Sequence, residues 1–193
     1  MTTWTQLQAD VIAWTNRTDV SDKIASFVGV FEARCRRNLR VRAMETAFSG
    51  TINASNKIAI PAGFLAFKAL WPTATPQVPI TVQFLDYLIA RNRTTGVPTS
   101  YTLDGANVLF DGVGAITGVY YTDIPGIVAN ASNWLSLSAY DAYLYGTLSE
   151  VWDYLQDDVQ AQKYLQRSAV VLESLIGADA RDKHSGPLVA RKR

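Results

Sequence analysis

Few residues in this 193-residue chain have the types and spacing that catalysis needs. The only histidine, His184, falls in a polar C-terminal segment that would not hold it against a nucleophile, so Ser-His-Asp and Cys-His arrangements are not expected. The only cysteine, Cys35, falls on the apolar stripe of a predicted helix, where we expect a small buried hydrophobe and not a reactive thiol. A single cysteine excludes an internal disulfide and a multi-cysteine metal site, and favours a reducing compartment.

The densest group of carboxylates is Asp153, Asp157 and Asp158. Three carboxylates could bind a divalent cation, but Asp157 and Asp158 stand at a predicted helix start, where carboxylates cap backbone amides. The glycines form neither a P-loop nor a strand-associated GxGxxG motif. We therefore expect no catalytic, metal or cofactor site and no enzyme, and a metal-dependent enzyme built on these aspartates remains as a weaker alternative.

The segment RCRRNLRVR contains five arginines within nine residues, although the formal net charge of the whole chain is only +1. These residues are Arg34, Arg36, Arg37, Arg40 and Arg42. Counted at 100° per residue, Arg36, Arg37 and Arg40 lie opposite the apolar stripe of the helix, Arg34 flanks it, and Arg42 lies near the helix end. The arginines form either a solvated face favoured by the helix dipole, or a charged face for an acidic partner subunit or DNA phosphates.

The apolar spacing predicts helices near both ends of the chain. A first helix runs from Thr3 to about Trp14 with a Thr3/Gln6 capping box, and a second begins near Ser21. A long apolar stripe predicts one helix from Trp134 to Leu155, and QDD then caps a last helix that ends at Gly177. These two C-terminal helices are expected to form an antiparallel hairpin. The many aromatic residues in the stripes are expected to be core or subunit contacts.

Short β-like runs separated by Gly, Pro and Asn occupy the middle of the chain. TAFSGTI and KIAI flank NASN, which predicts a hairpin, and YTL and VLF flank DGAN, which predicts another. FLAFKALW and GAITGVYYT are further strands, and residues 81–93 have helical spacing. The predicted fold class is α+β: a helical body, residues 1–45 and 126–177, that carries a β-rich insertion at 46–125.

The segment from Ala178 to the C-terminus has no apolar period, and its five cations outnumber its two carboxylates. We expect an extended or disordered basic arm at 178–193, either solvated or docked on a partner through Leu188 and Val189. No basic segment followed by an apolar run opens the chain, and no apolar stretch free of breaks is long enough for a membrane span, so we expect a soluble protein without a signal peptide.

The order of these segments resembles the head-to-tail adaptor (connector) proteins of tailed bacteriophages. The matching strings are VIAWTNRTDV, SFVGVFEARCRRNLRVRAMET, IAIPAGFLAFKALW, TGVPTSYTLDGANVLF, GVYYTDIPGI and NWLSLSAYDAYLYGTLSEVWDYLQDD. The resemblance as a whole covers about Trp4 to Ile176, nearly the whole chain. Gly63 departs from the pattern, which has an acidic residue between PA and FL. The arginine-rich end of the second helix belongs to the pattern, so the resemblance favours an assembly surface there.

The resemblance implies a structural virion protein of the neck, assembled in the host cytoplasm, that forms a ring, commonly of twelve copies. The implied partners are the portal above, tail or nozzle proteins below, other copies of the chain, and the genome, which passes through the bore without sequence-specific contacts. No membrane partner is implied. It further implies that the C-terminal arm docks on the portal, with Leu188, Val189, Arg191, Lys192 and Arg193 as the arm residues. Another neck or tail-completion subunit, or a nucleic-acid-binding module that uses the arginine-rich helix end, remains as the alternative.

Overall fold

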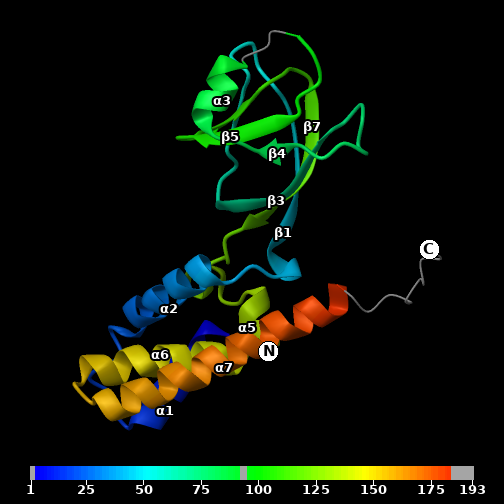
Figure 1. Cartoon of the computed structure of the whole chain (residues 1–193). Helices are drawn as coiled ribbons and strands as arrows, with labels where there is room; N and C mark the ends of the chain where they lie inside the picture. The colour runs from blue at the N-terminus through cyan, green and yellow to red at the C-terminus, as the bar shows by residue number, and fades with distance from the viewer. Residues whose placement is uncertain (1–2, 92–94, 184–193) are drawn as a thin grey trace, which may run out of the picture. The chain divides into compact units, whose positions relative to one another are not determined.

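The computed structural model describes residues 3–91 and 95–183. The described residues form two compact units (Figure 1): the helical unit, from the described parts of Met1–Ala43 and Ile124–Arg193, and the β-rich unit, from the described part of Met44–Asp123. Among the described residues, every strand lies in the β-rich unit and most of the helices lie in the helical unit, which confirms the α+β class.

The two N-terminal helices of the helical unit are α1 (Trp4–Thr15) and α2 (Ile24–Asn38). The hydroxyl of Thr3 caps α1 by accepting the N–H of Gln6 at 3.3 Å, whereas the Gln6 side chain donates to Asp10 and does not complete the predicted capping box. α2 begins three residues later than predicted because residues 18–23 form turns. Its predicted apolar stripe is confirmed by four buried side chains, Ile24, Val28, Phe31 and Cys35.

The C-terminal part of the helical unit contains α4 (Ile127–Asn130), α5 (Trp134–Ser138), α6 (Tyr140–Tyr154) and α7 (Asp158–Lys183). The single helix predicted through Leu155 is wrong, because Ala139 leaves the helical conformation, with φ −146° and ψ 62°, and separates α5 from α6. α6 and α7 lie side by side as the predicted antiparallel hairpin (Figure 1). α6 also packs against α1 and α2, so it is the central helix of the unit.

The predicted end of the last helix at Gly177 is wrong, because α7 continues to Lys183. A glycine inside a helix costs about 1 kcal/mol, but the last turns gain their own contacts. The Asp179 carboxylate accepts the backbone N–H of Arg42 at 2.9 Å and pairs with Lys183 at 2.5 Å. Residues 178–183 of the predicted extended arm are therefore helical. The remainder of the arm, 184–193, with Leu188, Val189, Arg191, Lys192 and Arg193, lies outside the described residues, as does His184.

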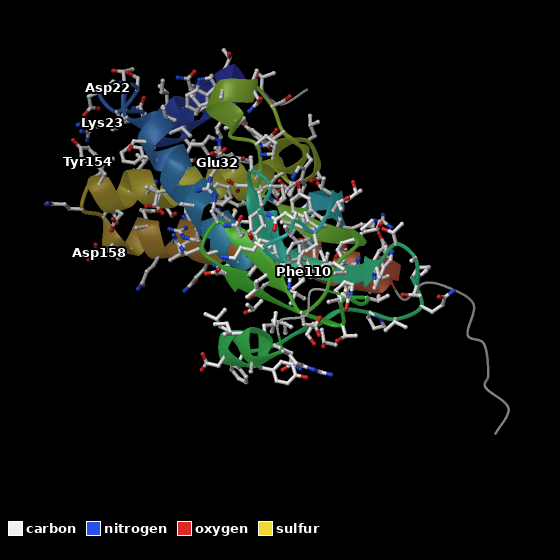
Figure 2. The ribbon with its side chains drawn as sticks, turned by 90° about the horizontal axis from the view of Figure 1, so that it is seen from above. Asp22, Lys23, Glu32, Phe110, Tyr154 and Asp158 are labelled. Atoms are coloured by element: carbon white, nitrogen blue, oxygen red, sulfur yellow. The ribbon has the colours of Figure 1, made fainter. Side chains whose placement is uncertain are left out.

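The strands of the β-rich unit form two sheets around one core. β1 (Glu45–Thr51), β7 (Ala115–Thr122) and β3 (Phe64–Pro72) form an antiparallel sheet in that order. The second sheet has the order β2 (Lys57–Ala59), β6 (Asn107–Phe110), β5 (Ser100–Asp104) and β4 (Thr81–Val82), with β4 parallel to β5. The shared core consists of Phe48, Ile52, Leu70, Ile80, Val108, Phe110, Ile116 and Tyr120. Figure 2 labels Phe110, which is fully buried there.

Of the two predicted hairpins, only the one formed by β5 and β6 is confirmed, with Gly105 in its turn at φ 59°. The hairpin of TAFSGTI with KIAI is wrong. Asn53 organises the predicted turn by accepting the N–H groups of Ser55 and Lys57, but the strands then separate. β1 pairs with β7 over seven residues and β2 pairs with β6, because a longer ladder satisfies more backbone groups than the three residues of β2 could.

Two further segments of the β-rich unit refine the sequence-based expectations. Within the described part of the segment predicted to be helical, residues 81–91, the helix is α3 (Leu85–Ala90), because Thr81 and Val82 join the sheet as β4. Gly63, the departure from the adaptor pattern, has φ +70°, a conformation that favours glycine.

Candidate assembly surfaces

The structure divides the five predicted arginines between internal contacts and the surface. Arg34, Arg36 and Arg37 lie on α2, whereas Arg40 follows the helix and Arg42 begins a single 3-10 turn, Arg42–Met44.

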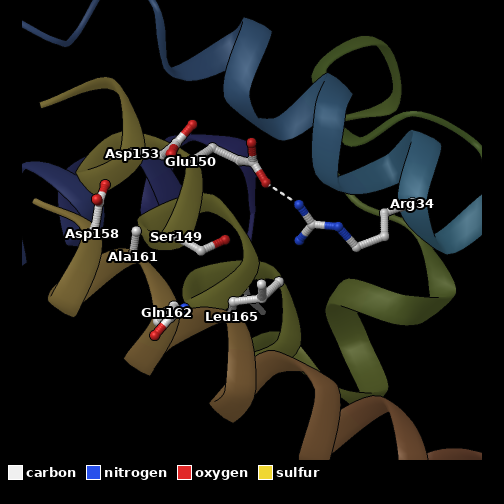
Figure 3. A pocket seen from close by; sticks show the side chains of 8 residues that line it. All are labelled: Arg34, Ser149, Glu150, Asp153, Asp158, Ala161, Gln162 and Leu165. Carbon is white, nitrogen blue, oxygen red and sulfur yellow. Dashed lines mark hydrogen bonds and ion pairs between the residues drawn. The ribbon is translucent and has the colours of Figure 1, made fainter. Parts of the chain in front are cut away.

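Two of these guanidinium groups hold the subunit's own fold. Arg34 pairs with Glu150 of α6 (Figure 3). Arg40 donates to the carbonyls of Arg36 and Leu39, at 2.8 and 2.6 Å, and so satisfies acceptors that the end of α2 leaves open. Both contacts form within a single subunit, without a partner.

The other three arginines, Arg36, Arg37 and Arg42, are exposed. Arg42 is fixed through its backbone, which donates to Asp179. The exposed part of the predicted arginine cluster therefore consists of two residues in the last turn of α2 and one beyond the helix.

The predicted carboxylate group lies at the turn between α6 and α7. Asp157 accepts the N–H of Gln160 at 3.0 Å, so its predicted capping role is confirmed, and Asp158 is the first residue of α7. Within residues 3–91 and 95–183, no three or more His, Cys, Asp or Glu side chains are grouped so as to hold a metal ion.

Asp153 and Asp158 line a pocket of about 360 Å³ between α2, α6 and α7 (Figure 3). The Arg34–Glu150 pair forms part of its lining, and Ser149, Ala161, Gln162 and Leu165 complete it. The Arg34–Glu150 pair neutralises its own charge, so the two aspartates make this pocket acidic. We call this face of the hairpin, together with Glu173 and Ile176 farther along α7, the acidic flank.

A second surface of the hairpin combines cations with aromatic rings, and sequence reasoning did not identify it. Arg167 of α7 lies over the rings of Tyr145 and Tyr164, with its guanidinium carbon 5.7 and 5.6 Å from their centroids. Lys163 lies 5.3 Å from the centroid of Tyr164, and Trp14 of α1 packs beside both tyrosines. We call this surface the basic flank. The i, i+4 spacing of Lys163 and Arg167 was the available sequence signal.

The basic flank borders its own pocket, of about 470 Å³, which is lined by Tyr145, Lys163, Gln166, Arg167, Val170 and Val171. No carboxylate partner of Arg167 is found in the part of the chain that the structure describes. Cation–π contacts hold this guanidinium in place while its N–H donors stay available for a partner's carboxylate.

The β-rich unit has an exposed apolar surface of its own around α3. Val82, Phe84 and Ile89 are 67%, 85% and 61% exposed, and Leu85 and Tyr87 accompany them. Apolar side chains gathered at this exposure are typical of a surface that another protein covers.

Two other observations concern the chemical character of the chain. Cys35 is fully buried, and burial raises the pKa of its thiol to about 12, which confirms the predicted inert hydrophobe. In the described ranges, we find no helix with both the length and the apolar character that crossing a bilayer requires.

Comparison with known proteins gives a clear relationship for the whole chain. A family model described as SU10 adaptor protein matches residues 2–191. A search of curated proteins found no match. Because the family model covers nearly every residue, including both structural units, the chain belongs to the SU10 adaptor protein family, and it is a structural bacteriophage adaptor.

Proposed function

We propose that this protein is the head-to-tail adaptor of a tailed bacteriophage, and that copies of it form a ring beneath the portal. The ring joins the capsid to the tail and passes the genome through its bore. The observation that carries this proposal is the family match over residues 2–191, which includes both units. The protein would then be a component of the virion neck, assembled in the host cytoplasm, and not an enzyme.

The surfaces of the helical unit support a ring. A closed ring of identical subunits uses heterologous contacts, in which one face of each copy meets a different face of the next. The hairpin of α6 and α7 has two chemically different faces, because one pocket is lined by Asp153 and Asp158 and the other by Lys163 and Arg167. A ring of twelve copies is the number that the family resemblance implies.

We propose that different parts of the chain contact the different virion proteins. We propose that the basic arm, residues 184–193, docks on the portal through Leu188 and Val189, with Arg191, Lys192 and Arg193 facing acidic groups. The exposed apolar residues around α3 offer a surface for a tail or nozzle protein. Arg36, Arg37 and Arg42, the exposed arginines, remain candidates for contacts with neighbouring subunits or with passing DNA.

To test the proposal, the purified chain is mixed with its cognate portal and the products are imaged by electron microscopy. The informative truncation ends at Lys183, because a cut after Gly177 would also remove the last turns of α7 and the Asp179 contact to Arg42. We expect a ring under the portal with the full chain and none, or far fewer, with the truncated chain.

Two matched variants separate the parts of the arm. L188S/V189S removes its apolar pair, and R191A/K192A/R193A removes its terminal charges. We expect the first to lower portal affinity more, since apolar burial contributes more to affinity than exposed charges do. A full-length chain with no portal affinity would contradict the adaptor proposal, and steeply salt-dependent binding to duplex DNA would then support the nucleic-acid alternative.

A further inference from the structure

The two flanks of the α6–α7 hairpin lie on opposite sides of α7. Counted at 100° per residue from Asp158, the residues that line the acidic flank stay within about 60° of one direction. These are Asp158, Ala161, Gln162, Leu165, Ala169, Leu172, Glu173 and Ile176, while Ser168, which also lines this side, lies about 80° away. Lys163, Arg167 and Val170 point about 120 to 180° away from that direction. The two buried residues of α7, Tyr164 and Ser168, lie between the flanks and face α6.

The flanks have opposite charges. On the acidic flank, Asp153, Asp158 and Glu173 are exposed carboxylates, and the charge of Arg34 is already balanced by Glu150. On the basic flank, Lys163 and Arg167 are exposed cations held over aromatic rings. Charged side chains of opposite sign that are already ordered form ion pairs at a smaller entropic cost than mobile ones.

Both flanks also carry exposed apolar side chains. Leu165 and Ile176 are each 40% exposed on the acidic flank. On the basic flank, Val170 is 64% exposed, and Val171 lines the same pocket. An interface core needs apolar groups from both partners, surrounded by polar pairs, and each flank provides its half of that arrangement.

From this complementarity we propose that the basic flank of one copy binds the acidic flank of a second copy, so that α7 is the subunit-to-subunit contact of the assembled adaptor. In this contact, the cations at Lys163 and Arg167 enter the pocket lined by Asp153 and Asp158 of the next copy. This inference rests on the ring of the proposed function and specifies which faces close it. A contact between two different faces leaves each copy able to bind one neighbour on either side.

Duplex DNA is a less suitable occupant of the basic flank. The flank has two cations, Lys163 and Arg167, whereas tight non-specific binding to DNA uses about six to ten phosphate contacts. DNA also offers no apolar partner for Val170, whose side chain is 64% exposed on this flank. A second copy of the chain satisfies both the charges and the apolar groups.

The test uses charge reversal in the full-length chain, with ring formation on the cognate portal measured as a function of chain concentration. Arg167→Glu alters the basic flank and Asp153→Lys the acidic flank. Both side chains are exposed, so both variants should fold, which far-UV circular dichroism checks. Arg17→Glu is the matched control, because Arg17 is an exposed arginine that lines neither pocket and pairs with nearby Asp19.

We expect each single flank variant to need at least about tenfold more chain for half-maximal ring formation, since like charges then face each other. The R167E/D153K double variant should recover, because its reversed flanks again have opposite charges. An equimolar mixture of the two single variants should recover too, because copies that alternate around the ring make only matched contacts. The R17E control should behave as the unaltered chain does.

Several outcomes would overturn the inference, and they can be told apart. If the single variants form rings at the same concentration as the unaltered chain, the proposed contact between the flanks is wrong, but the proposed ring is not contradicted. If ring formation is weakened in the single variants and does not recover in the double variant or in the mixture, the two flanks do not pair directly. Loss of duplex-DNA affinity in R167E with unchanged ring formation would make the basic flank a nucleic-acid surface. An unaltered chain that forms no ring would overturn the proposed function and this inference together.

Discussion

The helical unit and the β-rich unit each use a carboxylate to hold a chain segment in place, but over different distances in the sequence. In the helical unit, Glu32 of α2 accepts the N–H of Ile127 at 2.8 Å and the hydroxyl of Tyr143 at 2.9 Å, partners 95 and 111 residues away. In the β-rich unit, Asp111 accepts two N–H groups and a hydroxyl from Thr99 and Ser100, 12 and 11 residues away. Figure 2 labels Glu32 among the helices.

The difference follows from how the chain forms each unit. The helical unit combines two segments that flank the whole insertion, so its polar contacts must fix where the chain returns after residue 123. Asn133 extends this network by donating to Tyr143 and to the carbonyl of Pro125. The β-rich unit is one continuous segment, and Asp111 only has to fix the start of β5. Substitutions at contacts between distant segments should therefore destabilise the whole helical unit, whereas substitutions at Asp111 should have a more local effect.

The largest effect is expected at Gly146, where α6 passes Phe31 of α2. A Cβ atom at Gly146 would lie 2.1 Å from the Phe31 ring, so Gly146→Ala forces the two distant segments apart. We expect a loss of about 3 kcal/mol in the free energy of unfolding, measured by chemical denaturation. Gly29→Ala is the matched control: a Cβ there meets nothing within 4 Å, and the helix should gain about 0.5–1 kcal/mol. Equal effects of the two variants would contradict the close packing at Gly146.

The next largest effect is expected at Asp111, which is almost completely buried. Burial alone would raise the pKa of its carboxyl, but the hydrogen bonds from Thr99 and Ser100 prevail and lower the pKa below its ordinary value. Asp111→Asn should cost about 2 kcal/mol near neutral pH, because charge-assisted hydrogen bonds are replaced by weaker ones. Hydrogen exchange should show the loss of protection mainly around β5 and β6.

The Asp111 contribution also has a defined pH dependence. A carboxyl whose pKa is lowered by folding stabilises the folded state above its unfolded pKa of about 3.9, and this stabilisation is lost as the pH falls through the folded pKa. The acid limb of the stability curve should therefore be flatter in D111N than in the unaltered chain. An identical acid limb in the two proteins would show that Asp111 does not contribute.

A smaller effect is expected for Glu32→Gln. The amide oxygen of Gln can accept from Ile127 and Tyr143 in place of the carboxylate, so the network survives with weaker bonds, and we expect a loss of about 1 kcal/mol. Glu32→Ala removes the acceptor and should cost about 2 kcal/mol or more. Hydrogen exchange should show lower protection on both α2 and α6. An effect confined to residues next to Glu32 would remove the distinction between the two units.

The smallest effect is expected in the chemical labelling of Cys35, an experiment that needs no mutation. Cys35 is fully buried on α2 and its thiol has a pKa raised to about 12, so the folded chain should react with a thiol reagent at least about a hundredfold more slowly than the unfolded chain. The residual rate reports how often the helical unit opens. Fast labelling under native conditions would contradict the tight core around α2.

Local patterns predicted the elements whose signals are local. The apolar stripe of α2, the Thr3 cap of α1 and the β5–β6 hairpin are all determined within a few residues of sequence. The errors occur where contacts between residues far apart in the sequence determine the local structure. The pairing of β1 with β7 links residues about 70 apart, which no turn signal at NASN can reveal. The break at Ala139 has neither a Pro nor a Gly to mark it.

The candidate surfaces show the same limit. The sequence identified the arginine cluster near the end of α2, but not that Arg34 pairs with Glu150 across 116 residues of sequence. It also missed the basic flank, because Tyr145 joins Arg167 only through the packing of α6 on α7. The helical period of α7 could have placed Lys163 and Arg167 on one face, but the carboxylates on the opposite face come from two helices.

The central claim is that this chain functions as one subunit of a portal-bound ring. It is tested most directly by electron microscopy of the full-length chain bound to its cognate portal, at a resolution that places α7 in each copy. The account predicts a closed ring in which Lys163 and Arg167 of each copy face Asp153 and Asp158 of the next. A portal that binds no ring of this chain would contradict it.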